Sequence, residues 1–293
     1  MGSSSASQAR KALVMKGMQA AIAARTKANI DQKSPTCIYG LCESNGVVVR
    51  FNDINMEGMY DREPRPRIHV SALRPLARRT FTCAHELGHH IFGHGSTIDE
   101  LRDDQAQNSN RPPNEILADS FASFVLMPTL GLREAFTRRD LDPNKASAIE
   151  MYSIACTFGV GQSTLVNHLA YGVEMIGSTQ RATLGQVTPK MIRTELLGEV
   201  VAEPLTVADH HWNSPTLDAE EGALLLLPAG VVVDTKILMP ERDLATGRLF
   251  RTMKPGVTRV VIPGTSWATY VRVARRQYVG LARFRHLEDS TDD

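Results

Sequence analysis

The sequence predicts an α+β fold made of two domains, the first with a small antiparallel sheet packed on helices and the second rich in strands. At 293 residues, the chain is long enough for about two domains. Apolar residues recur at helical spacing up to about residue 172, and β-branched runs between turn signals predominate from about residue 183. We therefore expect one domain over residues 1–180 and a second over residues 183–293.

The amino-acid composition excludes several classes of protein. Lys and Arg total 33 and Asp and Glu total 32, which gives a formal net charge of +1. A near-neutral chain does not suit the binding of nucleic acid through bulk positive charge. Hydrophobic residues make up 42% of the chain and charged residues 22%, which is ordinary globular usage and excludes global disorder.

No segment of the sequence predicts export or a membrane span. The longest apolar run, residues 223–233, is too short to cross a bilayer and is interrupted by Pro228 and Gly230. The polar residues at the start are not followed by the apolar core of a signal peptide. Four cysteines are too few for a disulfide scaffold, which fits a reducing compartment. We therefore expect a cytoplasmic protein that does not contact a membrane.

The first domain is expected to combine short strands with amphipathic helices. Residues 8–27 contain no glycine except Gly17, which predicts a helix, and apolar residues at helical spacing predict a buried helix over residues 74–92. After an Asn45-Gly46 turn, a β-branched run predicts a strand. The other elements expected are strands at 58–60 and 68–70, a loop at 93–113, helices at 114–127, 129–139 and 143–158, and a last helix after a turn with Gly159 and Gly161.

The second domain is expected to consist mainly of strands, with Trp267 in its core. The sequence does not identify the role of this domain. The two roles that we consider are a sensor and a module that docks a partner. His210 and His211 have no companion ligands at suitable spacing, so we expect an ordinary surface loop there. The predicted strands are 224–227, 231–233, 257–262, 268–273 and 278–284.

The stretch His85-Glu86-Leu87-Gly88-His89 carries the chemistry of the first domain. Two histidines at i and i+4 share one face of a helix, with Cβ atoms about 5–6 Å apart, so both imidazoles can reach one metal ion. Glu86 is one step round the helix from His85, where it can act as a general base without displacing a ligand. The pattern predicts a metal-dependent hydrolase, with peptide bonds as the expected substrate.

A third ligand is expected on the next helix, where Glu115 and Asp119 are also spaced at i and i+4. We expect Glu115 to bind the metal and Asp119 to hold the far ring nitrogen of a histidine, which would fix its tautomer. Two His and one Glu leave a fourth position open for water, the pattern of catalytic zinc, although manganese also fits this ligand set.

The first domain resembles the ImmA/IrrE family of regulatory zinc metallopeptidases over roughly residues 10–172. The resemblance is carried by residues 81–89 with the two-histidine motif, by Glu115 to Pro128, and by residues 155–169 with Phe-Gly-Val-Gly. In that family the last segment is helix-turn-helix-like, which applies here to about residues 143–172. Gly161 stands where the family usually has Ser. The second domain resembles nothing that we recognise.

The resemblance implies a zincin-like fold and a cytosolic zinc-dependent endopeptidase. Such proteins typically cut one partner, a helix-turn-helix transcriptional repressor, and so derepress stress-response or mobile-element genes. Residue by residue, it implies His85, His89 and Glu115 as metal ligands and Glu86 as the general base, while Asp119 stands where the family often has Asn or Asp.

An alternative is a DNA-binding or partner-binding transcriptional regulator that uses the peptidase fold as a scaffold. The helix-turn-helix-like segment supports it. The expected recognition helix offers only Asn167 and His168 as polar side chains that could read bases, so direct binding of nucleic acid is not favoured.

Three further expectations concern the substrate. The tetrahedral oxyanion needs a donor besides the metal, and the sequence leaves His90, His94 and Tyr60 open. Residues 67–71 are expected to be the edge strand that pairs with a substrate strand. The loop at 93–113 is acidic through Asp99, Glu100, Asp103 and Asp104, which would suit a basic repressor, although an ordinary solvated loop is the favoured interpretation.

Overall fold

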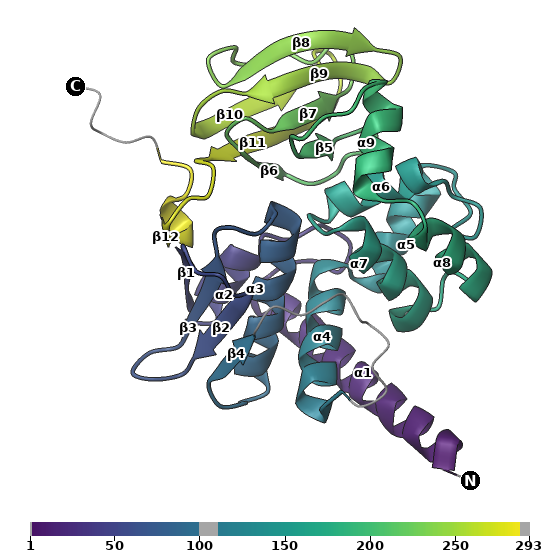
Figure 1. Ribbon diagram of the computed structural model, residues 1–293, viewed down its shortest axis with the longest axis vertical. Coiled ribbons are helices and arrows are strands. Elements are labelled where there is room, and N and C mark those ends of the chain that lie inside the picture. The colour runs from purple at the N-terminus through teal and green to yellow at the C-terminus, as the bar shows by residue number, and fades with distance from the viewer. Residues whose placement is uncertain (1, 100–110, 288–293) are drawn as a thin grey trace.

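The computed structural model describes residues 2–99 and 111–287 and has the two-part architecture shown in Figure 1. A mixed sheet and the long helices lie at one end, and the β-rich domain lies at the other. The helices are α1 (Gly2–Lys27), α2 (Ile38–Ser44), α3 (Leu76–Ile91), α4 (Pro113–Leu126), α5 (Thr129–Arg138), α6 (Ala148–Thr157), α7 (Gln162–Asn167), a π-helical turn (His168–Gly172), α8 (Ser178–Gly185) and α9 (Pro189–Leu197).

The sheet of the first domain is mixed, which corrects the antiparallel sheet that the sequence predicts. Its strand order is β12-β1-β3-β2-β4, and β1 runs parallel to β3 whereas the other pairs are antiparallel. The chain reverses direction between β1 and β2 and again in the hairpin between β2 and β3, so β3 runs in the same direction as β1. Because β3 lies between β1 and β2, it pairs with β1 in parallel. The strands are β1 (Val48–Asn52), β2 (Gly58–Asp61), β3 (Arg67–Ser71), β4 (Thr97–Asp99) and β12 (Gly280–Leu281).

The expectation that residues 67–71 form an edge strand is wrong. β3 is the central strand, with β1 on one side and β2 on the other. The edges are β12 and β4, and β4 falls in a segment that the sequence predicts as loop. A strand's neighbours depend on pairings far apart in the chain, so local sequence patterns do not identify the edge of a sheet.

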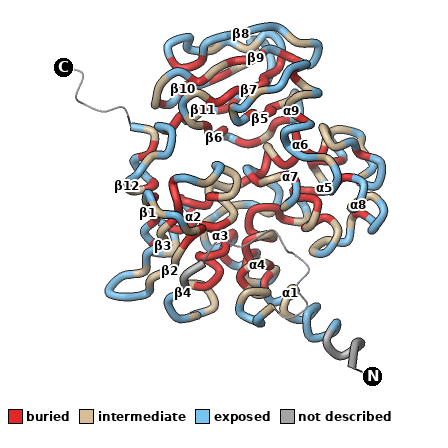
Figure 2. The backbone as a smooth tube through the Cα atoms, viewed as in Figure 1, coloured by how far each residue is buried: buried red, intermediate tan, exposed pale blue. Residues whose placement is uncertain are grey.

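Three helices pack in succession on one side of this sheet. α3 packs on β2 and β3, α4 packs along α3, and α1 packs along α4. Figure 2 shows stretches of buried residues in both α3 and α4. The core of the domain includes Phe51, Ile68, Leu87 and Phe121, each 1% exposed or less. At about 25 cal/mol per Å² of apolar surface, such burial is the main stabilising contribution to the domain.

Gly17 lets α1 lie directly against α4. A Cβ atom at this position would clash with the Cβ of Ser120 and would lie 2.9 Å from the backbone nitrogen of Phe121. We expect Gly17→Ala to lower the free energy of unfolding by about 1–2 kcal/mol, because overpacking costs more than the gain of about 1 kcal/mol in helix propensity. Urea unfolding monitored by circular dichroism measures this change.

Gly40 provides the matched control in helix α2. A Cβ atom there meets nothing within 4 Å, so Gly40→Ala should raise the free energy of unfolding by a few tenths to 1 kcal/mol. Equal effects of the two substitutions would contradict the close packing of α1 on α4.

The second domain is a sandwich of two sheets covered on one side by helices. A three-stranded sheet, β10-β11-β6, faces a four-stranded sheet, β5-β7-β9-β8, across a core that includes Trp212, Phe250 and Trp267. The other face of the four-stranded sheet packs against α6 and α9. The strands are β5 (Leu205–Val207), β6 (Thr216–Glu220), β7 (Leu224–Leu227), β8 (Leu238–Leu244), β9 (Gly247–Thr252), β10 (Gly256–Val261) and β11 (Ala268–Ala274).

The run of four leucines in β7 is explained by burial on both faces. Leu225 and Leu227 enter the core between the sheets, whereas Leu224 and Leu226 pack toward α6 and α9. A strand buried on both sides lacks the alternation of a half-buried strand. The sequence predicts β7, β10 and β11 closely, and Trp267 lies in the core as expected.

Two expected strands of this region take other forms. Residues 231–233 form only an isolated bridge, Val232 with Val261, because Pro228 and Gly230 turn the chain just before them. Residues 278–284 form the two-residue strand β12 and a 3-10 turn, and β12 pairs with β1 in the sheet of the first domain. His210 and His211 are exposed in a turn, as predicted.

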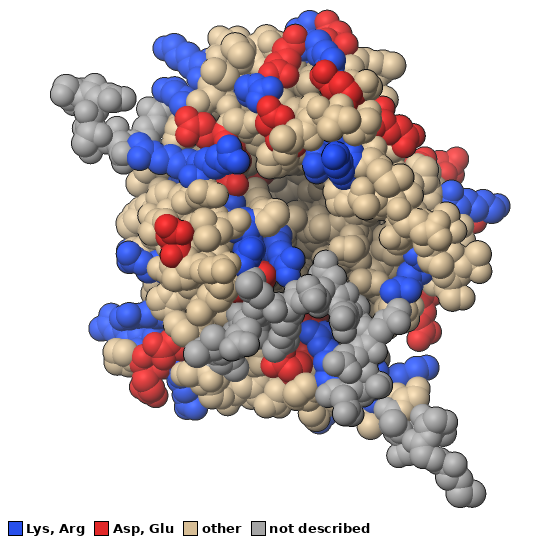
Figure 3. Space-filling view, viewed as in Figure 1, with Lys and Arg blue, Asp and Glu red and all other residues tan. Residues whose placement is uncertain are grey.

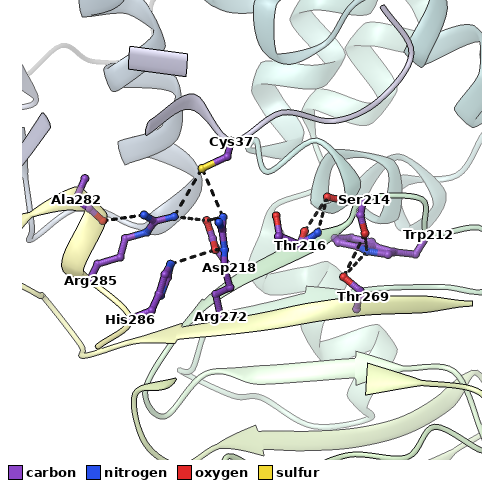
Figure 4. Close-up of polar contacts among 10 residues, drawn as sticks. All are labelled: Cys37, Trp212, Ser214, Thr216, Asp218, Thr269, Arg272, Ala282, Arg285 and His286. Carbon is purple, nitrogen blue, oxygen red and sulfur yellow. Dashed lines mark hydrogen bonds and ion pairs between the residues drawn. The ribbon is translucent and has the colours of Figure 1, made fainter. Parts of the chain in front are cut away.

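Charged side chains join the two domains where β6 and β11 face the first domain (Figure 4). Asp218 accepts two hydrogen bonds from Arg272, at 2.5 and 2.7 Å, and one from Arg285 at 3.1 Å. The same two guanidinium groups lie 3.5 and 3.7 Å from the Sγ atom of Cys37, just before α2. Arg79 of α3 forms a further ion pair with Glu220 of β6. Figure 3 shows that the surface is hollowed between the two domains on the face drawn.

Asp218 is expected to stabilise this joint in a pH-dependent way. Burial alone would raise the pKa of Asp218, but the charges of Arg285 and Arg272 outweigh it and hold that pKa below its usual value. We expect Asp218→Asn to lower the free energy of unfolding by about 3 kcal/mol at neutral pH, because two largely buried guanidinium groups lose their charged partner.

The pH dependence follows from the direction of the shift. A carboxyl whose folded pKa is lowered stabilises fully above its unfolded pKa of about 3.9 and loses that contribution as the pH falls further. Urea unfolding should therefore show a constant difference between wild type and Asp218→Asn from pH 7 to 5 that shrinks below about pH 4. Exposed Asp53 is the control, since Asp53→Asn should change stability by less than about 0.5 kcal/mol.

Candidate metal centre

The two histidines of the motif lie on the buried face of α3. His85 is 4% exposed and His89 is 1% exposed, and their Nε2 atoms are 3.0 Å apart. The helix begins after Pro75, and its last carbonyls are satisfied by the backbone of Phe92, Gly93 and His94. The helical spacing therefore places both rings on one side, as the sequence predicts.

Glu115 of α4 completes a group of three potential ligands. Its carboxylate oxygens lie 3.6 Å from Nε2 of His85 and 3.6 Å from Nε2 of His89. One ligand atom from each of the three residues lies within 4.8 Å of the other two. Gly88 permits this approach of α4 to α3, because a Cβ there would lie 2.9 Å from the Cα of Ala118.

Asp119 lies one helical turn beyond Glu115 and contacts the far side of His85. Nδ1 of His85 is 2.8 Å from Oδ1 of Asp119, so that nitrogen carries the hydrogen and the lone pair of the ring lies on Nε2. The other carboxylate oxygen of Asp119 accepts a short hydrogen bond from Arg111. The sequence does not single out Arg111, whose position two residues before α4 is the only local signal.

The electrostatics of the site favour a neutral imidazole at His89. Burial lowers the pKa of His89 to about 4, and the neighbouring charge of His85 acts in the same direction. Metal binding needs unprotonated histidine nitrogens, so this shift suits a ligand. Two imidazoles and one carboxylate, with ligand atoms within 4.8 Å of one another, are a donor set that fits a divalent metal ion.

Glu86 follows the candidate ligand His85 in α3 and is completely buried. Its Oε1 atom faces Gly58 of β2, where a Cβ would come within 3.3 Å of it. A Cβ at this position would also clash with the Cγ2 atom of Thr82, so glycine permits the close approach of β2 to α3 beside Glu86.

The three candidate oxyanion donors lie in two different environments. The hydroxyl of Tyr60 and Nδ1 of His90 are 2.9 Å apart and form a pair. Nδ1 of His94 instead lies 2.8 Å from Nδ1 of His89. All three residues line an open pocket of about 350 Å³, together with Arg62, Glu63, Pro64, Pro66 and Gly93. Which of them donates to an oxyanion stays a prediction.

The helix-turn-helix-like segment is formed by α6, a turn and α7. Glu150 and Ser147 make a capping box at the start of α6, and Gly159 has a φ of +65° in the turn. His168 follows α7 but is 4% exposed, with Nε2 at 3.0 Å from the carbonyl oxygen of Met127. Burial lowers the pKa of His168 to about 4. His168 is therefore a core residue here, and Asn167 accepts a hydrogen bond from Arg181.

Two remaining expectations concern surfaces and membranes. Of the predicted acidic rim, Glu100, Asp103 and Asp104 lie outside the described residues, and Asp99 belongs to β4. In the described part of the chain, no single helix has the length and apolarity to cross a membrane, although the bent pair of α4 and α5 passes such a test by length and composition.

A mixed sheet backed by a helix with two histidines, and a second helix that brings a glutamate to them, define a domain of the metallopeptidase type. Comparison with protein families agrees: residues 42–169 match the family described as the IrrE N-terminal-like domain, a peptidase family. This match agrees with the resemblance of the first domain to the ImmA/IrrE family. The match includes every residue of the candidate metal centre. No curated protein matches the chain.

Proposed function

We propose that this protein is a cytoplasmic zinc-dependent endopeptidase that cleaves one specific protein partner, a helix-turn-helix transcriptional repressor, and thereby derepresses stress or mobile-element genes. The observation that carries the proposal is the convergence of His85, His89 and Glu115 within 4.8 Å, next to the buried carboxylate of Glu86. Zinc is the default for two histidines and one glutamate with a free position.

Each residue of the site has a separate role in the proposed peptide hydrolysis. A metal ion bound here would supply Lewis-acid activation of water and of the scissile carbonyl. The Glu86 carboxylate takes the proton of the attacking water and delivers it to the leaving amine. Asp119, fixed by Arg111, holds the hydrogen on Nδ1 of His85 and so keeps Nε2 available as a ligand.

The choice of substrate and compartment rests on the family and on composition. Repressor cleavage is what the ImmA/IrrE resemblance implies, and the formal net charge of +1 favours control of genes through a DNA-binding protein rather than through DNA. All four cysteines are free, which is consistent with a reducing cytoplasm.

The alternative, a DNA-binding regulator on a peptidase scaffold, has less support. That function requires side chains in the segment after α7 that form hydrogen bonds to DNA bases. His168 is buried, so it cannot contact a base. The helix α7 itself is six residues long and has no Lys or Arg.

The proposal is tested with the full chain loaded with Zn²⁺ and a panel of helix-turn-helix repressors from the same genome, beginning with any encoded beside it. We expect one repressor to be cut at a single bond, with products identified by mass spectrometry, and expect a chelator to stop the reaction until Zn²⁺ is restored. Repressors that all remain intact, together with salt-sensitive binding of the chain to a specific DNA duplex, would support the alternative instead.

A further inference from the structure

The chain turns back over the end of α3 immediately after the two-histidine motif. Gly93 has a φ of +68°, a conformation that favours glycine. The N–H groups of Gly93 and His94 donate to the carbonyls of His90 and His89, at 3.1 and 3.0 Å. These two bonds form a Schellman motif, which ends the helix and reverses the chain direction. As a result, His94 lies against the last turn of α3.

This turn places the ring of His94 against His89. The two Nδ1 atoms are 2.8 Å apart, and the ring centroids are 5.0 Å apart. On its other side, His94 stacks on the ring of Phe92 with an interplanar angle of 22°. The imidazole of His94 is therefore fixed in orientation by a hydrogen bond and by an aromatic contact.

The geometry assigns the hydrogen between the two rings. Nε2 of His89 faces His85 and Glu115, so it is the nitrogen with the lone pair for a metal ion. Nδ1 of His89 then carries the hydrogen and donates it to Nδ1 of His94. The contact has the same form as that of His85, whose Nδ1 donates to Asp119.

We propose that His94 is a positioning residue that fixes the tautomer and the ring orientation of the ligand His89. The inference rests on the metal centre of the proposed function. This role differs from that of an oxyanion donor. Nδ1 of His94 accepts a hydrogen bond from His89, so it does not donate one to a substrate. Loss of such a partner typically weakens metal affinity 10–100-fold.

Two amide substitutions distinguish the roles. In His94→Asn the amide oxygen can occupy the place of Nδ1 and accept from His89, whereas in His94→Gln the amide reaches the place of Nε2. We expect His94→Ala and His94→Gln to bind Zn²⁺ about 10–100-fold more weakly than wild type, and His94→Asn to recover most of this loss. Competition with a chromogenic chelator measures the affinity of the full chain without any substrate.

His90→Ala is the matched control, since His90 is a neighbouring histidine that contacts Tyr60 and no ligand. It should leave Zn²⁺ affinity unchanged, and the thermal unfolding of the metal-free variants shows whether each one folds. Unchanged Zn²⁺ affinity in His94→Ala, or rescue by Gln rather than Asn, would overturn the positioning role. Absence of Zn²⁺ binding by the wild-type chain would instead overturn the metal centre of the proposed function.

Discussion

Glu86→Gln is expected to slow cleavage of the proposed repressor substrate by about 10²–10⁴-fold while Zn²⁺ binding remains unchanged. Gln has nearly the same shape as Glu but cannot take a proton from the attacking water. Glu86 is completely buried, so replacing its carboxylate by a neutral amide does not add a desolvation cost. The measurement is the single-turnover rate of repressor cleavage, followed by gel electrophoresis, at saturating Zn²⁺.

Glu115→Gln is the comparison that separates the two glutamates. Glu115 is expected to be a ligand, so its substitution should weaken Zn²⁺ binding and cleavage together. A Glu86→Gln protein that cleaves the repressor at the wild-type rate would show that another group removes the proton. Equal loss of metal in both variants would show that Glu86 belongs to the ligand set.

Arg25→Ala is expected to produce the largest loss of stability, about 3–5 kcal/mol. The side chain of Arg25 is 0% exposed and donates only to backbone carbonyls: that of Val125 at 2.6 Å, that of Ser34 at 2.5 Å and that of Asp31 at 2.5 and 3.0 Å. Burial lowers the pKa of Arg25 to about 10, so it remains charged at neutral pH. Its loss leaves three carbonyls without their donor and opens a cavity beside α4.

Urea unfolding at pH 7 measures the effect, and Arg10 in the same helix provides the control. Arg10 is exposed, and Arg10→Ala should change the free energy of unfolding by less than about 0.5 kcal/mol. The free energy of unfolding of Arg25→Lys should lie between those of wild type and Arg25→Ala. An ammonium group keeps the positive charge but lacks the planar guanidinium group that donates to several carbonyls at once. A loss below 1 kcal/mol in Arg25→Ala would contradict this account.

The candidate metal centre was predictable because its residues lie at short, regular spacings in the sequence. His85 and His89 are four residues apart on one helix, and Glu115 and Asp119 repeat that spacing on the next. Helical periodicity fixes which side chains share a face, and the two helices follow one another in the chain. By contrast, the contact of Arg111 with Asp119 and that of His94 with His89 depend on how a loop and a helix end are folded, which spacing alone does not reveal.

The fold was predictable where periodicity is strong and less so where pairing is long-range. The sequence predicts α3 and α4 to within two residues at each end. It does not place β3 at the centre of its sheet, and it misses β8, an edge strand whose exposed charged residues lack a buried face. The helix α9 carries local signals at both ends: Thr188 caps it, Pro189 begins it and Gly198 ends it with a φ of +71°.

The pairing of β12 with β1 has a consequence for synthesis of the protein on the ribosome. Chains emerge from the N-terminus, and domains generally fold as they appear. Here the fifth strand of the first sheet comes from Gly280 and Leu281, which are made after the whole β-rich domain. The first domain cannot finish its sheet until those residues have left the ribosome, so a partly made chain carries the candidate metal ligands in an incomplete fold.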